Sequence, residues 1–70
     1  MTQQERILDY IDKHGSITPM DAFLDLGITK LATRVSELIR GGVRIEKTQK
    51  TGKNRFGEIA HYMEYRRDKP

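Results

Sequence analysis

Residues 17–38 have the sequence ITPMDAFLDLGITKLATRVSEL, and their pattern decides the fold of this chain. Thr18 followed by Pro19 predicts the start of a helix, because threonine caps a helix N-terminus and proline fits its first position. Met20, Phe23 and Leu24 are spaced to form a buried stripe on this helix. We expect the helix to end at Gly27, since glycine favours the conformation that terminates helices. Ile28-Thr29 then predicts a tight turn.

A further helix is expected directly after this turn, from Lys30 to Arg40, with Thr29 as its cap. Helical steps of about 100° per residue place its apolar side chains in one sector and its polar side chains opposite. The apolar sector contains Leu31, Ala32, Val35, Leu38 and Ile39, and the polar sector contains Lys30, Thr33, Glu37 and Arg40, with Arg34 and Ser36 at its edges. This segment is therefore an amphipathic helix that shows a polar face to solvent.

The flanking segments complete the expected fold. Thr2 and Glu5 form a capping-box pattern that predicts a first helix over residues 3–13, ended by Gly15. From Val43 the apolar period changes to two, which predicts a strand over residues 43–50. Residues 51–57 carry turn residues, and residues 59–65 predict a returning strand with Ile59, His61, Met63 and Tyr65 on its more apolar face. We expect Phe56 to pack back on this sheet.

This order of elements predicts an α+β fold. We expect a three-helix core followed by a two-stranded β-hairpin wing. The second and third helices form a helix-turn-helix, because the link between them has the length that this motif uses. We expect one domain over residues 1–65 and a disordered tail over residues 66–70.

Composition argues against several functional classes. A chain of 70 residues has little room for a substrate cavity beside its core, so we expect no enzyme and no catalytic residues. The absence of cysteine and the presence of only two histidines argue against a metal site, and no cofactor is expected. The sequence has no apolar run long enough to span a membrane, so we expect no membrane partner and a cytoplasmic location.

The charge distribution is uneven along the chain. Residues 1–29 contain two Lys/Arg and five Asp/Glu, whereas residues 30–70 contain eleven Lys/Arg and five Asp/Glu. Such an asymmetry favours a polyanionic partner, although a solvated basic surface is the alternative.

Two groups of residues are candidate DNA contacts. Side chains on the polar face of the third helix suit the edges of base pairs in a major groove. Cations in the hairpin turn suit phosphate contacts or a narrow minor groove. The alternatives are an Arg34–Glu37 ion pair on a solvated helix and turn charges that prevent sheet-edge pairing. The full set comprises Lys30, Thr33, Arg34, Glu37, Arg40, Lys50, Lys53, Asn54 and Arg55.

The chain also resembles a known family. The stretch from Ile17 to Leu38, followed by Gly41-Gly42 and Ile45, is similar to the small winged helix-turn-helix proteins of bacteria and their phages, over about residues 2–65. The resemblance implies DNA binding, with the third helix as the recognition helix and residues 50–57 as the wing.

Residues and resemblance together predict duplex DNA as the partner. We expect a small transcriptional regulator or a phage accessory factor, with the helix over residues 30–40 in the major groove and the wing on the backbone. A module of this size covers little DNA, so a homodimer or cooperative binding on DNA is expected. The alternative is a winged-helix protein-interaction module, such as a phage inhibitor of a host protein.

Overall fold

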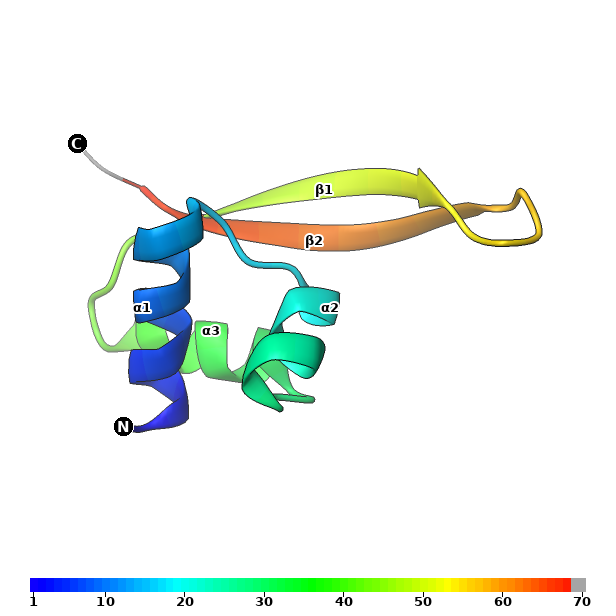
Figure 1. Cartoon of the computed structure of the whole chain (residues 1–70). Helices are drawn as coiled ribbons and strands as arrows, with labels where there is room; N and C mark the ends of the chain where they lie inside the picture. The colour runs from blue at the N-terminus through cyan, green and yellow to red at the C-terminus, as the bar shows by residue number, and fades with distance from the viewer. Residues whose placement is uncertain (69–70) are drawn as a thin grey trace.

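The computed structural model describes residues 1–68 and confirms the expected fold class, with three helical segments followed by a two-stranded antiparallel hairpin (Figure 1). The second helical segment begins as an α-helix, α2, and continues as a π-helix, η1. The elements in chain order are α1 (Gln3–His14), α2 (Pro19–Asp21), η1 (Ala22–Leu26), α3 (Leu31–Arg40), β1 (Ile45–Lys53) and β2 (Ile59–Arg67).

Helix α1 begins at the predicted capping box. The Glu5 amide donates to the Thr2 hydroxyl oxygen at 3.1 Å, and the Thr2 amide donates to the Glu5 carboxylate at 3.1 Å. The helix ends one residue later than predicted, and Gly15 at its C-terminus has the left-handed φ of 92° that favours glycine. Local sequence signals therefore set both ends of this helix.

The second helical segment also starts as predicted, but it buries other residues. Thr18 caps it, and the Asp21 carboxylate accepts a hydrogen bond from the Thr18 amide at 3.0 Å. The predicted buried stripe is wrong, since Met20, Phe23 and Leu24 are 64%, 56% and 69% exposed. Ala22 is fully buried instead, because η1 packs through this small side chain and turns the larger ones outward.

Helix α3 packs through the centre of its predicted apolar sector. Leu31, Val35 and Leu38 are buried, whereas Ala32 and Ile39 at the sector's edge are exposed. The predicted cap is wrong, because Lys30 rather than Thr29 occupies the N-cap position and no side chain caps the helix.

The hairpin is longer than predicted. β1 starts at Ile45 rather than Val43 and continues to Lys53, where it pairs with Ile59 of β2. β2 continues through Arg67, so Arg66 and Arg67 are paired with β1 and do not belong to a disordered tail. The Asp68 amide donates to the Arg44 carbonyl at 3.2 Å, and residues 69–70 lie outside the described residues. The true turn thus covers only residues 54–58.

The hydrophobic core lies between the helices and the base of the hairpin. Ile17 joins the two parts, because its amide and carbonyl both bond to Tyr65 of β2, at 2.8 and 2.9 Å. On the face of β2 that was expected to be apolar, Tyr65 is buried and Met63 is partly buried. Ile59 and His61 on the same face are exposed, because the hairpin extends beyond the body there (Figure 1). The buried residues are Ile7, Ile11, Ile17, Ala22, Ile28, Leu31, Val35, Leu38 and Tyr65.

Candidate nucleic-acid interface

The outer surface of α3 presents three of the predicted DNA-contacting residues to solvent. Lys30 lies at the N-cap, Thr33 in the first turn and Arg40 in the last turn, and all three are exposed. The chain enters α3 on the side of the body toward which the hairpin projects, and leaves it on the opposite side (Figure 1). Lys30 and Thr33 therefore lie at the end of α3 nearer the wing, and Arg40 at the far end.

Two other residues of α3 that were predicted to contact DNA form hydrogen bonds with other residues of the protein. The Arg34 guanidinium donates to the Glu37 carboxylate at 2.8 and 3.0 Å and to the Gln3 side-chain oxygen at 2.9 Å. The Gln4 amide group also donates to Glu37, at 2.8 Å. The Arg34–Glu37 contact is the ion pair that the sequence offered as the alternative. The hydrogen bonds to Gln3 and Gln4 connect this pair to the start of α1.

The same contacts affect the ionisation of Glu37. The hydrogen bond from Arg34 is the largest cause that lowers the pKa of Glu37, and the bond from Gln4 adds to it. About one third of each side chain of the pair remains accessible, 31% for Arg34 and 35% for Glu37. Arg34 and Glu37 thus contact each other and the start of α1.

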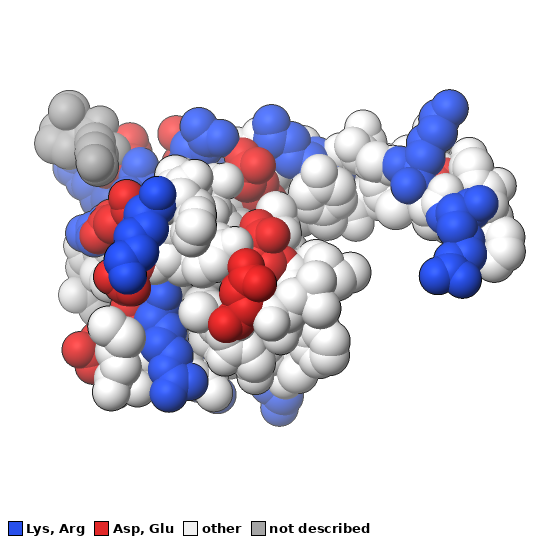
Figure 2. Space-filling view, in the orientation of Figure 1, with Lys and Arg blue, Asp and Glu red and all other residues white. Residues whose placement is uncertain are grey.

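The turn of the hairpin carries exposed cations. Lys53 ends β1 and Arg55 lies in the turn, and neither forms an ion pair with any residue from 1 to 68. Figure 2 shows basic side chains at the free end of the hairpin, apart from the helical body. Lys53 and Arg55 are thus accessible to an anionic partner.

Asn54 and Lys50 have other surroundings. The Asn54 side-chain oxygen accepts hydrogen bonds from the amides of Phe56 and Glu58, at 2.9 and 3.1 Å, so this residue builds the turn. Lys50 lies half-buried within β1. The hydrogen bond from Arg66 is the largest cause that lowers the pKa of Glu64, and the charge of Lys50 contributes. The sequence grouped these residues with Lys53 and Arg55 because it does not show which side chains have partners within the protein.

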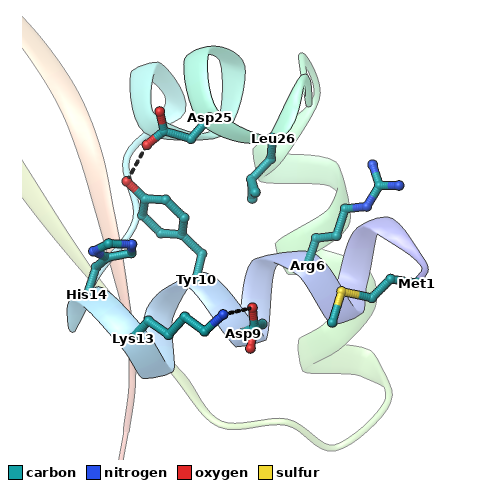
Figure 3. Close-up of a pocket in the computed structure, with 8 residues that line it drawn as sticks. All are labelled: Met1, Arg6, Asp9, Tyr10, Lys13, His14, Asp25 and Leu26. Atoms are coloured by element: carbon teal, nitrogen blue, oxygen red, sulfur yellow. Dashed lines mark hydrogen bonds and ion pairs between the residues drawn. The ribbon is translucent and has the colours of Figure 1, made fainter.

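A pocket between α1 and η1 contains a contact that the sequence did not reveal (Figure 3). The Tyr10 hydroxyl donates to the Asp25 carboxylate at 2.7 Å, and this bond is the main cause that raises the pKa of Tyr10 to about 12. The Tyr10 ring lies against His14, with 4.3 Å between ring centroids, and Lys13 pairs with Asp9 at 3.1 Å. The hydrogen bond between Tyr10 and Asp25 therefore connects α1 to η1.

Among residues 1–68, no three His, Cys, Asp or Glu side chains are grouped in a way that could hold a metal ion. No helix within these residues is both long enough and apolar enough to cross a membrane.

Comparison with known proteins adds one finding. A family model described as a winged helix-turn-helix domain matches residues 2–66, which is nearly the whole chain. No curated protein and no solved structure gives a match.

Proposed function

Because the chain belongs to the winged helix-turn-helix domain family, we propose that it binds duplex DNA through α3 and the hairpin. Domains of this family are typically DNA-binding and not enzymatic. The observation that carries the proposal is the pair of exposed cations Lys53 and Arg55, which form no ion pair with any of residues 1–68, at the end of a hairpin that projects beyond the helical body (Figure 1).

The proposed role of α3 is to enter the major groove. Its 10 residues form a rod about 15 Å long, and a major groove about 12 Å wide admits such a helix. Residues at the start of a recognition helix are those that reach base edges. Lys30 and Thr33 therefore act in base contact, and Arg40 at the far end contacts a phosphate.

The remaining predicted residues of α3 have a supporting role in this proposal. Arg34 and Glu37 hold the helix at a set angle on α1, through contacts to each other and to Gln3 and Gln4. A recognition helix that is held rigidly loses less freedom on binding, which favours affinity. They act as positioning residues for α3.

The hairpin supplies sequence-independent contacts. Lys53 and Arg55 lie on the phosphate backbone beside the groove that α3 occupies, while Asn54 keeps the turn in shape and Lys50 adds positive charge along the strand. Phosphate contacts increase affinity for all sequences and do not select among them.

The biological role that we propose is a small transcriptional regulator or a phage accessory factor. A single module of this size covers about 600–1,000 Å², which is small for a specific complex. Homodimerisation or cooperative binding on DNA would supply the remaining affinity. Selection of bound duplexes from a random pool tests this point, because a palindromic site indicates a dimer with two-fold symmetry.

Salt dependence of duplex binding tests the proposal itself. Each phosphate contact contributes about −0.9 to the slope of log K against log salt concentration. The Lys53→Ala/Arg55→Ala double variant is therefore expected to bind all duplexes more weakly and to reduce the steepness of this slope by about 1.8, measured by fluorescence anisotropy.

The matched control removes two cations from α1 instead. The Arg6→Ala/Lys13→Ala variant has the same net charge as the hairpin variant, but its changes lie in the pocket shown in Figure 3. We expect its salt slope to equal that of the unaltered protein. Equal losses in the two variants would show that net charge alone drives binding, and absence of binding at low salt would overturn the DNA proposal.

A further inference from the structure

One exposed apolar surface has no role in the proposed DNA contact. Met20, Phe23 and Leu24 lie on one side of α2 and η1 and are all more than half exposed. We call these three residues the α2 patch. Soluble monomers rarely gather large apolar side chains on one surface unless that surface binds something.

A groove adjoins the α2 patch. It lies between the start of α2 and the outer part of β2, beneath the projecting hairpin, and Met20 belongs to both surfaces. Figure 2 shows the hollow between the helical body and the end of the hairpin. The groove is lined by Thr18, Pro19, Met20, Asp21, Ala60, His61 and Tyr62.

The charge beside the α2 patch is negative. Asp21 and Asp25 are the ionisable residues of the segment from Pro19 to Leu26, which contains no Lys or Arg. Two copies of this surface facing each other would bring like charges together, which disfavours a symmetric contact through α2. The surface fits a partner that is both apolar and basic.

The chain itself carries a surface of that kind. Phe56, at the end of the hairpin, is 78% exposed, and Ile59 beside it is 67% exposed. The expectation that Phe56 packs back on the sheet is therefore wrong. Lys53 and Arg55 lie in the same stretch, with Glu58 as its one acidic residue, so the hairpin end carries a net positive charge. The hairpin end projects away from its own helical body, so Phe56 is free to meet the α2 patch of a second copy (Figure 1).

We propose that the hairpin end of one copy docks on the α2 patch and groove of a second copy. Phe56 enters the groove, and the positive hairpin end faces the negative charge of Asp21, which lines the groove. Because the two docking surfaces are different, the contact is head-to-tail and each copy can bind one neighbour on each side. The contact forms without DNA and does not rest on the proposed function.

Sedimentation velocity of the full chain without DNA tests this inference. The unaltered protein is expected to associate reversibly as its concentration rises toward about 1 mM, and to dissociate when salt screens the charges. Phe56→Ser removes the group that docks, and Phe23→Ser removes part of the surface that receives it. Either variant alone is expected to weaken association roughly tenfold or more.

A mixture of the two variants gives the decisive result. The Phe23→Ser protein keeps an intact hairpin end and the Phe56→Ser protein keeps an intact α2 patch, so an equal mixture is expected to form pairs and nothing larger. Leu24→Ser replaces Phe23→Ser if the latter fails to fold, and Ile39→Thr, an exposed position on α3, is the control that keeps association. A protein that stays monomeric, a Phe56→Ser variant that still associates, or an Ile39→Thr variant that no longer does overturns the proposal.

Discussion

The helical body and the hairpin use their apolar residues in opposite ways. Within residues 1–68, eight of the nine buried residues lie in the segment from Ile7 to Leu38, and Tyr65 is the one that the hairpin contributes. Beyond its base the hairpin exposes Phe56, Ile59 and Tyr62. Burial of apolar side chains in the body therefore stabilises the fold, whereas the side chains of the outer hairpin remain accessible to solvent.

The body thus accounts for the stability of the fold, and the hairpin offers the side chains available for binding. The hairpin keeps its shape through the backbone ladder of β1 with β2 and through the Asn54 turn, neither of which needs a buried core. Its side chains are therefore available for binding a ligand. A substitution in the body, in contrast, is expected mainly to change the free energy of unfolding. Two pairs of substitutions test this division, and a third pair tests the ion pair on α3 of the body.

The largest expected effect comes from one substitution made in both regions. Ile7 in α1 is fully buried, and Ile59 in β2 is 67% exposed. Ile7→Ala is expected to lower the free energy of unfolding by about 2–5 kcal/mol, because it leaves a cavity. Ile59→Ala is expected to change it by less than about 0.5 kcal/mol. Urea denaturation measures both, and comparable losses would mean that the hairpin shares the core.

A smaller effect is expected from the residues that shape each region locally. Thr18→Ala removes the cap of α2 and is expected to lower the free energy of unfolding by about 1 kcal/mol. Asn54→Ala removes the acceptor for the Phe56 and Glu58 amides and is expected to speed their hydrogen exchange while the amides of α1 keep their protection. Faster exchange throughout α1 in the Asn54 variant would contradict the division.

The smallest effect concerns the pH dependence of stability in the body. The pKa of Glu37 in the folded protein lies below its ordinary value of 4.5. The ionised carboxylate therefore stabilises the fold at neutral pH, and this contribution is lost as pH falls through the folded-state pKa. Glu37→Gln is expected to flatten the decline of the urea midpoint between about pH 5 and pH 3.

Arg34→Gln provides the control for the cause of that effect. Since the hydrogen bond from Arg34 is the main cause of the lowered pKa of Glu37, its loss is expected to flatten the pH profile in the same way. A profile that keeps its original slope in the Arg34 variant would assign the shift to Gln4 or to other surroundings.

Short-range patterns predicted most of the secondary structure. The capping box at Thr2 and Glu5, the Thr18-Pro19 start and the glycines at residues 15 and 27 depend on neighbours within a few residues. The period of α3 likewise identified Leu31, Val35 and Leu38 as its buried side. Each of these signals expresses a local preference of the backbone, so no distant contact was needed to interpret it.

Long-range contacts decided the points that the sequence missed. Met20, Phe23 and Leu24 have a helical spacing that suits burial, but the close approach of η1 through Ala22 leaves them in solvent. Arg34 and Glu37 have a spacing that suits a groove-facing surface, but Gln3 and Gln4 of α1 lie within hydrogen-bond distance of them. Spacing identifies one face of a helix, and it does not identify which neighbour occupies that face.

The amino-acid sequence by itself thus determined the order of the elements, the fold class and the presence of two basic candidate surfaces, because capping, periodicity and charge are local properties. Only the tertiary structure decided which side of η1 is buried, how far the hairpin extends and which charged residues of α3 remain exposed. These features depend on how segments distant in the chain pack together, and packing selects among faces that the sequence pattern leaves equivalent.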